Sequence, residues 1–164
     1  GKTAADFGSS TGGFTEVLLE RGIEQVRAFD VGTGQMDPKV AANKKVIQHE
    51  GVNCRAIPEE LLEPKVDLVV MDVSFISQTK VLPMAKAILK PEGQVISLVK
   101  PQFELQPEDI DTRGIVKDAS RYDVVHQKIR KAAKDLGFTV SDFIYSPIKG
   151  GDGNREFLVV LKTT

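Results

Sequence analysis

The chain has 164 residues, of which 41% are hydrophobic and 27% are charged, and its formal net charge is −1. This length favours a single domain over residues 1–164, which would bury roughly two-thirds of the surface that its unfolded chain exposes. The composition excludes an intrinsically disordered segment, and the near-neutral charge excludes a uniformly basic nucleic-acid-binding protein, so an RNA partner would need a local basic patch.

Strand and helix patterns alternate along the chain. Runs of apolar, β-branched and aromatic residues predict seven strands, at Thr3–Phe7, Gln25–Asp30, Lys45–His49, Val66–Asp72, Gln94–Val99, Thr139–Tyr145 and Arg155–Leu161. Helical spacing predicts helices over Gly13–Arg21, Asp37–Ala42, Pro58–Leu62, Gln78–Leu89 and Ser120–Leu136. We expect Val17 on the apolar side of the first helix, Lys128 on the solvent side of the last, and a turn at residues 90–93.

This order of elements predicts an α/β fold with a seven-stranded, mostly parallel sheet and helices on both faces. The last two strands are separated only by Ser146–Asn154, a glycine-rich connection that we expect to be flexible. Because so short a connection cannot hold a crossover helix, the last strand should be antiparallel.

The first strand and the turn after it predict a nucleotide pocket. Asp6 lies near the end of the strand, a glycine-rich turn follows from Gly8, and the first helix begins near Gly13. Asp30 ends the second strand. Doubly wound folds bind ligands at the carboxyl ends of their strands, where a carboxylate on the second strand holds ribose hydroxyls.

The turn favours S-adenosylmethionine over a dinucleotide. The dinucleotide fingerprint needs glycine at its first, third and sixth positions, and here these are Gly8, Ser10 and Gly13. The glycine that lets the backbone approach a pyrophosphate is therefore replaced. Asp6 would repel a pyrophosphate but suits a cationic ligand. A nicotinamide-dependent oxidoreductase stays open as an alternative.

Asp72 and Lys100 end two central strands and should face one crevice beside the cofactor. A partly desolvated lysine loses its proton more readily than in water, where its pKa is ~10.4, and can then act as a general base. Asp72 would orient it, although a structural ion pair is the alternative. Glu156 begins the predicted antiparallel strand and could join them from the same edge of the sheet.

Five segments resemble the FtsJ-like ribose methyltransferases, and within them the TlyA or haemolysin A family, in the right order along nearly the whole chain. They are Asp-Phe-Gly-Ser-Ser-Thr-Gly-Gly-Phe-Thr (6–15), Phe-Asp-Val-Gly-Thr-Gly-Gln-Met (29–36), Met-Asp-Val-Ser-Phe-Ile-Ser (71–77), Leu-Val-Lys-Pro-Gln-Phe-Glu (98–104) and Gly-Asn-Arg-Glu-Phe (153–157). The resemblance implies a Rossmann-like class I methyltransferase fold and ribose 2′-O-methylation of ribosomal RNA.

The resemblance also assigns roles to residues. Asp72, Lys100 and Glu156 match the last three members of the family's Lys-Asp-Lys-Glu catalytic set, whose first lysine lies in a helix upstream of the first strand. S-adenosylmethionine would be held by Asp6, Gly8, Ser9, Ser10, Gly12, Gly13, Phe14, Asp30, Asn53 and Asp72. Because the chain opens at Gly1 directly on the first strand, we expect a fragment that lacks this helix and the family's N-terminal S4-type RNA-binding domain.

The partner implied is RNA, and the candidate phosphate contacts are Lys39, Lys44, Lys45, Arg113, Lys117 and Arg121. Acidic residues between 104 and 121 offset the last three. The two histidines lack metal-ligand spacing, so we expect no metal. The single Cys54 favours a reducing, cytoplasmic setting, and the absence of about 18 consecutive apolar residues predicts no stable membrane insertion. A haemolysin-type membrane-active protein and a cofactor-binding domain inactive without its N-terminal region stay as alternatives.

Overall fold

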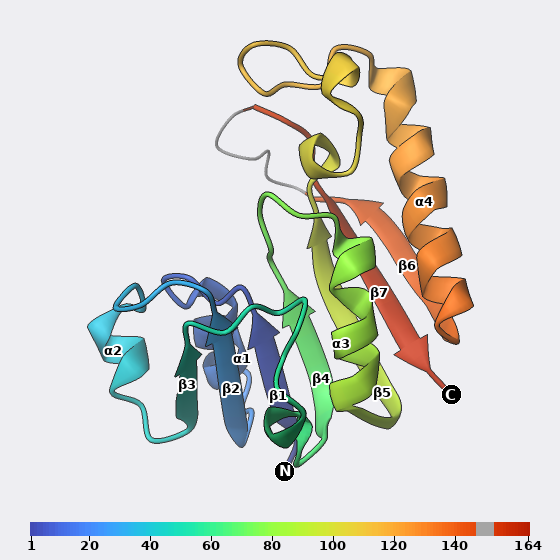
Figure 1. The fold of residues 1–164 in the computed structure, drawn as a ribbon. Coiled ribbons are helices and arrows are strands. Elements are labelled where there is room, and N and C mark those ends of the chain that lie inside the picture. Colours follow the sequence, from blue (N-terminus) through green and yellow to red (C-terminus); the bar gives the residue numbers. More distant parts are fainter. Residues whose placement is uncertain (147–152) are drawn as a thin grey trace.

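The computed structural model describes residues 1–146 and 153–164, which form one seven-stranded sheet (Figure 1). Its strands are β1 (Thr3–Phe7), β2 (Gln25–Asp30), β3 (Val46–Glu50), β4 (Val66–Met71), β5 (Leu89–Val99), β6 (Phe138–Tyr145) and β7 (Phe157–Thr163). Their order in the sheet is β3-β2-β1-β4-β5-β7-β6. Strands β1 to β5 are parallel, and β7 pairs antiparallel with both β5 and β6, which confirms the prediction for the last strand.

The helices are α1 (Gly13–Glu20), α2 (Pro38–Ala41), α3 (Leu82–Ile88) and α4 (Tyr122–Asp135) in the described part of the chain, with several 3₁₀ turns. All five predicted helices are shorter than expected, and in three of them a 3₁₀ turn forms part or all of the segment. The helix predicted at Pro58–Leu62 is a 3₁₀ turn, Glu59–Leu62. A 3₁₀ turn, Gln78–Lys80, precedes α3, and another, Ala119–Arg121, precedes α4.

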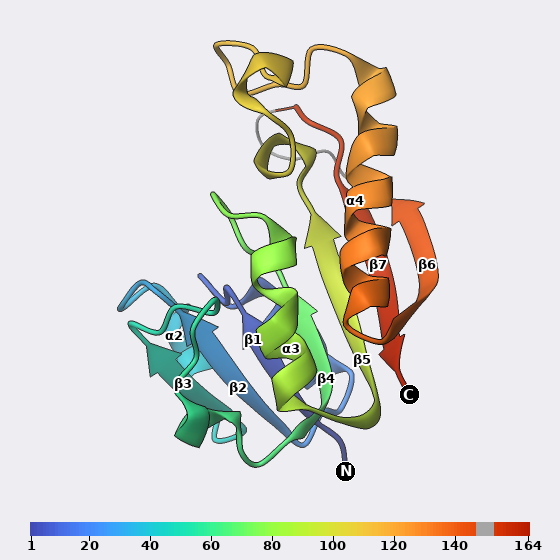
Figure 2. The same ribbon diagram turned by 45° about the vertical axis from the view of Figure 1, so that its right-hand side comes forward.

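Different helices cover the two faces of the sheet (Figures 1 and 2). Helices α3 and α4 pack on one face, over a core that includes Phe7, Val69, Val95 and Val159. Helix α1 packs on the other face against β1 and β2. Because side chains alternate along a strand, the other residues of β5 and β7 point away from α3 and α4. These residues, Ile96, Leu98, Leu158 and Val160, are half-buried.

Three local expectations are wrong. Val17 is 49% exposed, because α1 packs on the sheet through its neighbours Leu18 and Leu19. Lys128 does not simply face water but forms an ion pair with the buried Glu104. The turn at residues 90–93 lies inside β5 rather than before it: Val66 pairs with Leu89, pairing resumes at Leu68 and Gln94, and the intervening residues bulge out.

The order of the strands fixes where a ligand can bind. From β1 the chain moves outward to β2 and β3, then returns to β4 on the other side of β1. In open sheets of this kind, the crevice forms beyond the carboxyl ends of the strands where the direction reverses. The ends of β1 and β4, with Asp6 and Asp72, flank that point. The connection expected to be flexible is described only at residues 146, 153 and 154, since residues 147–152 lie outside the described residues.

Candidate active site

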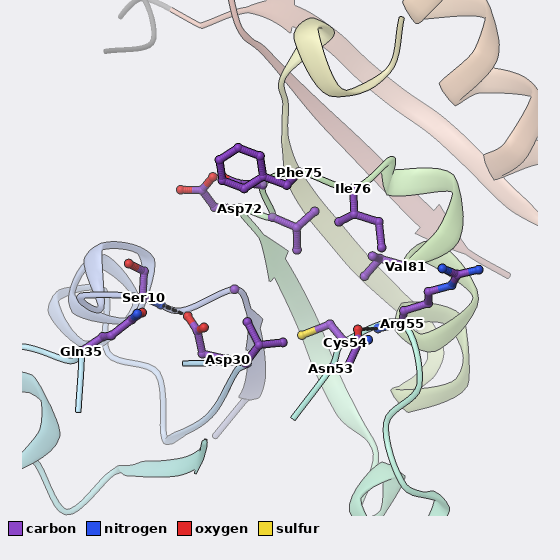
Figure 3. A pocket seen from close by; sticks show the side chains of 14 residues that line it. Ser10, Asp30, Gln35, Asn53, Cys54, Arg55, Asp72, Phe75, Ile76 and Val81 are labelled. Carbon is purple, nitrogen blue, oxygen red and sulfur yellow. Dashed lines mark hydrogen bonds between the residues drawn. The ribbon is translucent and has the colours of Figure 1, made fainter. Parts of the chain in front are cut away.

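A pocket of about 320 Å³ lies beyond the carboxyl ends of β1, β2 and β4 (Figure 3). Figure 3 shows Ser10 and Asp30 on one side of it and Asp72 and Phe75 on the other. Its lining comprises Gly8, Ser10, Asp30, Val31, Gln35, Asn53, Cys54, Arg55, Asp72, Val73, Ser74, Phe75, Ile76 and Val81. Five of these, Gly8, Ser10, Asp30, Asn53 and Asp72, were predicted from the sequence as cofactor-binding residues.

Gly8 allows the turn after β1 to lie directly against the end of β4. Its φ is +78°, and a Cβ atom there would lie 2.5 Å from the backbone oxygen of Asp72. Its N–H donates a 2.8 Å hydrogen bond to the oxygen of Phe29 in β2. Any side chain at this position would therefore push apart the strand ends that form the pocket.

Asp30 holds the turns after β1 and β2 together. The backbone N–H of Ser10 donates to Oδ2 of Asp30 at 2.5 Å, and that of Gly32 donates to Oδ1 at 2.9 Å. Ser10 has a φ of +47°, so a non-glycine residue occupies the left-handed region here. Since this backbone N–H is bound to a carboxylate, it is not available to the pyrophosphate of a dinucleotide.

Asp6 lies beneath the turn and does not line the pocket. Its side chain is fully buried, and its Oδ2 accepts a 2.7 Å hydrogen bond from the hydroxyl of Thr15. Burial raises the pKa of Asp6 to about 7, and the nearby charges of Asp72 and Asp30 add to the increase, while the hydrogen bonds from Thr15 oppose it. Its Oδ1 has no hydrogen-bond partner among the described residues.

The other residues of the turn that were predicted to bind the cofactor do not line the pocket, except for Asn53 in a later loop. Gly12, with a φ of +98°, caps the start of α1, and a Cβ there would lie 3.1 Å from Cγ1 of Val40. Ser9 is buried and lines a separate small cavity. Gly13 and Phe14 are the first two residues of α1, and neither lines the pocket. Asn53 lines the pocket, and its Oδ1 accepts a 2.9 Å hydrogen bond from the N–H of Arg55.

Lys100 and Asp72 meet at the rim of the pocket. Nζ of Lys100 lies 2.5 Å from Oδ1 of Asp72 and donates a 2.9 Å hydrogen bond to the hydroxyl of Ser74. The Lys100 side chain is 15% exposed and that of Asp72 is 38% exposed. The predicted juxtaposition of these two residues is therefore present, and Ser74 is a further partner that the sequence analysis missed.

Glu156 lies at the same edge of the sheet but does not line the pocket. It precedes β7, whose first residue, Phe157, pairs with Val99, the residue before Lys100. Continuing this register places Glu156 opposite Lys100. Its backbone oxygen accepts a 2.8 Å hydrogen bond from the N–H of Ser146.

Glu104, which the sequence analysis did not single out, ties the segment after β4 to the segment after β5. Its carboxylate accepts hydrogen bonds from the hydroxyl of Ser77 at 2.5 Å and the N–H of Gln78 at 2.8 Å. Lys128 of α4 lies 3.3 Å from its Oε1, and the Glu104 side chain is 1% exposed. These contacts fix the loop of Asp72 and Ser74 relative to the segment of Lys100.

Phe75 projects from the rim of the pocket. It is 90% exposed and has a φ of +63°, an unfavourable conformation for a bulky residue. Its ring lies 5.0 Å from that of Phe103, between ring centroids. An exposed aromatic ring on a strained backbone is unusual in a purely structural role.

Within the described residues, no group of three or more histidine, cysteine, aspartate or glutamate side chains could hold a metal ion. In the same part of the chain, no helix is both long and apolar enough to span a bilayer.

The sheet order, the antiparallel β7 and the pocket at the switch point define the Rossmann-like fold of S-adenosylmethionine-dependent methyltransferases. One such enzyme, from Methanosarcina mazei, superposes over 99% of this chain and 92% of its own with a TM-score of 0.69 at 12% identity, which shows the fold alone. The chain belongs to the FtsJ-like methyltransferase family, whose family model matches residues 1–163.

Two further proteins are similar to this chain in sequence. The 16S/23S rRNA (cytidine-2′-O)-methyltransferase TlyA of Mycobacterium tuberculosis is 37% identical over 99% of this chain and 61% of its own length. A solved structure from Lactococcus lactis, provisionally described as a hemolysin, is 42% identical with a TM-score of 0.95, over 100% of this chain and 79% of that one. The chain spans about three-fifths of the length of curated relatives that it matches.

Proposed function

We propose that this chain is the catalytic region of an S-adenosylmethionine-dependent RNA methyltransferase that modifies ribose 2′-hydroxyls of ribosomal RNA. The observation that carries the proposal is the Lys100–Asp72 pair at the rim of a pocket built at the switch point of a methyltransferase fold. Membership of the FtsJ-like family and the similarity to TlyA support the reaction and the substrate class.

The charge of the site suits S-adenosylmethionine. Asp30 and Asp72 line the pocket, Asp6 lies directly beneath it, and the raised pKa of Asp6 reflects burial together with these two neighbouring carboxylates. Oδ1 of Asp6 accepts no hydrogen bond from the described residues, so none of them offsets the charge of Asp6 at this oxygen when the carboxyl ionises. A cationic ligand would relieve it, and a pyrophosphate would worsen it.

The roles that follow for the residues are specific. Asp30 would hold the ribose hydroxyls of the cofactor, Asn53 would meet the adenine edge, and the backbone of residues 8–13 would hold its methionine part. Asp6 would act through its charge beneath the turn. When bound, the cofactor supplies a methyl group on a sulfonium, a strong electrophile, so the protein mainly has to supply positioning and a base.

Lys100 is the proposed base. In its neutral form, Nζ would accept the proton of the ribose 2′-hydroxyl and so leave its oxygen more nucleophilic. Asp72 and Ser74 already fix the position of Nζ, and Glu156 would orient the ribose from the opposite strand. By resemblance to the family, a further lysine lies upstream of β1, so we propose that residues 1–164 form the methyltransferase domain of a longer, cytoplasmic protein.

RNA would reach this site across basic side chains on both flanks. Lys39, Lys44, Lys45 and Lys117 are exposed. Arg113 and Arg121 instead form ion pairs with Asp111, at 2.9 Å, and Asp109, at 3.1 Å. We therefore assign phosphate contacts to the four lysines first, because their charge is not offset by these pairs.

Calorimetric titration with S-adenosylmethionine tests the cofactor, with NAD as the matched control. The proposal predicts binding of the first and no binding of the second, whereas the reverse would favour the nicotinamide-dependent alternative. A vesicle-leakage assay tests the membrane-active alternative, for which we expect no leakage. Transfer of a labelled methyl group to ribosomal RNA by the complete protein, as its gene encodes it, tests the reaction.

A further inference from the structure

A second, smaller pocket lies away from the cofactor site, between α4 and the edge of the sheet. Its volume is about 230 Å³, and we call it the aromatic pocket. It is lined by Tyr122, Asp123 and His126 of α4, Phe143 and Tyr145 of β6, and Phe157 of β7. Drug-sized ligands occupy about 300–1,000 Å³, so this pocket has room for a single ring system.

The aromatic pocket opens at the same edge of the sheet as the Lys100–Asp72 pair. The first turn of α4, the end of β6 and the start of β7 meet there (Figures 1 and 2). Phe157 pairs with Val99, the residue before Lys100, and with Tyr145 in β6. Since neighbouring strands lie about 4.8 Å apart, β6 is about 10 Å from β5, a distance that suits a nucleotide flanking the one that reacts.

The rings of the aromatic pocket are divided between a buried floor and an open rim. Phe157 is 6% exposed, and its ring centroid lies 5.6 Å from that of Phe143 and 4.9 Å from that of Tyr145. Tyr145 is 58% exposed, and the His126 ring lies 3.8 Å from that of Phe143. The floor belongs to the hydrophobic core, whereas Tyr145 offers an aromatic face to solvent.

Cationic groups flank these rings. The Arg155 guanidinium lies 5.0 Å from the centre of the Tyr145 ring, and that of Arg130 lies 5.9 Å from the centre of Phe143. Nε of Arg130 donates a 2.7 Å hydrogen bond to Nε2 of His126. Burial, with the charge of Arg130, lowers the pKa of His126, so its imidazole is neutral at physiological pH and behaves as a further flat ring.

We propose that the aromatic pocket binds one unstacked base of the RNA substrate, at a position flanking the methylated nucleotide. Every base has a face that stacks on aromatic rings, and single-stranded RNA is held by such platforms next to cationic groups. Arg155 and Arg130 complement the adjoining phosphates, and the Asp123 carboxylate accepts a hydrogen bond from an exocyclic amino group. This inference rests on the proposed function, because it takes RNA as the substrate.

The test compares two neighbouring residues of β6 in the complete protein. Tyr145→Leu keeps an apolar side chain but removes the ring, and Ile144→Ala changes the adjacent residue, which is 52% exposed and points to the opposite face. The probes are single-stranded RNA oligonucleotides carrying the fluorescent base 2-aminopurine at successive positions, together with protein-free ribosomal RNA for methyl transfer.

We expect quenching of 2-aminopurine by the parent protein and by Ile144→Ala, and its loss in Tyr145→Leu. In methyl transfer, Tyr145→Leu should raise KM for RNA at least about fivefold with kcat and S-adenosylmethionine affinity retained. Equal behaviour of the two variants in both assays would overturn the inference. So would a defect seen only with assembled ribosomal subunits, which would assign the pocket to a protein partner.

The two proposals fail in different ways. If the parent protein methylates no ribosomal RNA, the proposed function fails, and the fluorescence comparison still decides whether the aromatic pocket binds a base. If methyl transfer proceeds but Tyr145→Leu matches Ile144→Ala, the pocket is structural and the proposed function stands.

Discussion

The backbone N–H of Ser10 donates a 2.5 Å hydrogen bond to the carboxylate of Asp30, across the gap between the ends of β1 and β2. Asp30 therefore closes one side of the pocket at the carboxyl ends of β1, β2 and β4 before any ligand binds. Since its other oxygen accepts from Gly32, one side chain organises two turns at once.

Asp30→Ala should weaken S-adenosylmethionine binding about 10- to 100-fold. Hydrogen bonds to a charged group are worth about 1.5–3 kcal/mol, and the substitution removes both the ribose contact and the support of the two turns. Titration calorimetry checks this. The control is Asp37→Ala, since Asp37 also accepts from a backbone N–H, that of Lys39, but lies outside the pocket lining. Equal loss in both variants would contradict the assignment.

Asp6 should make the stability of the protein fall as pH rises. Its pKa is about 7 in the folded protein, above its ordinary value of 3.8, so the folded state binds a proton that the unfolded state has released. The contribution is fully present below about pH 4, decreases between pH 4 and 7, and is lost above 7. In all, it is on the order of 4 kcal/mol.

Urea unfolding between pH 4 and 8 measures this effect. Asp6→Asn cannot ionise, so the stability of the variant relative to the parent should improve as pH rises through this window. A constant difference between the two proteins would show that Asp6 is ionised throughout. With S-adenosylmethionine, binding to the parent should tighten as pH rises through about 7, because a cationic ligand favours the ionised carboxylate.

Glu104 should act as a positioning residue through the contacts that it makes with Ser77 and Gln78. Glu104→Gln should lower kcat with little change in KM for S-adenosylmethionine, because Glu104 does not line the cofactor pocket. Lys128→Met should destabilise the fold by about 1–3 kcal/mol, since it leaves a buried carboxylate without its cation. Lys131→Met removes an exposed lysine of the same helix and should have a smaller effect.

Phe75, at the rim of the pocket, offers a test of both strain and substrate binding. Phe75→Gly should stabilise the protein by about 1 kcal/mol, because glycine adopts the positive φ without strain and the ring contributes little burial. The same variant should raise KM for RNA, since it removes an exposed ring beside the reacting centre. Thermal unfolding and steady-state kinetics together check this, and a loss of stability would indicate that the Phe75–Phe103 contact is structural.

The sequence predicts the parts of the site that depend on strand order. Asp30, Asp72 and Lys100 each end or follow a strand, Asp6 is the last residue but one of its strand, and parallel strands bring such positions to one edge of the sheet. The structure adds that Asp6 is covered by its own turn. A strand-end position alone does not distinguish a side chain facing the pocket from one beneath it.

Other features depend on contacts between distant segments. Lys128 of α4, 24 residues further along the chain, packs over Glu104 and helps to bury it. No pattern in the sequence near Glu104 predicts this contact. The exposure of Phe75 could not be predicted from the sequence either, since an aromatic residue after a buried strand usually continues the core. The bulge within β5 follows from the pairing of Leu68 with Gln94, which only the assembled sheet reveals.

The most direct measurement of the central claim is methyl transfer from labelled S-adenosylmethionine to ribosomal RNA by the parent protein, Lys100→Ala and Lys90→Ala. Lys90 is the matched control, because it also pairs with an aspartate, Asp67 at 3.4 Å, but outside the site. A 2′-O-methylated nucleotide resists alkaline hydrolysis, which locates the methyl group.

We predict label at a ribose 2′-oxygen with the parent and Lys90→Ala, and a fall of about 10²–10⁴-fold in kcat with Lys100→Ala, whose S-adenosylmethionine binding is unchanged. Near-normal turnover by Lys100→Ala, or label on a base rather than a ribose, would contradict the account.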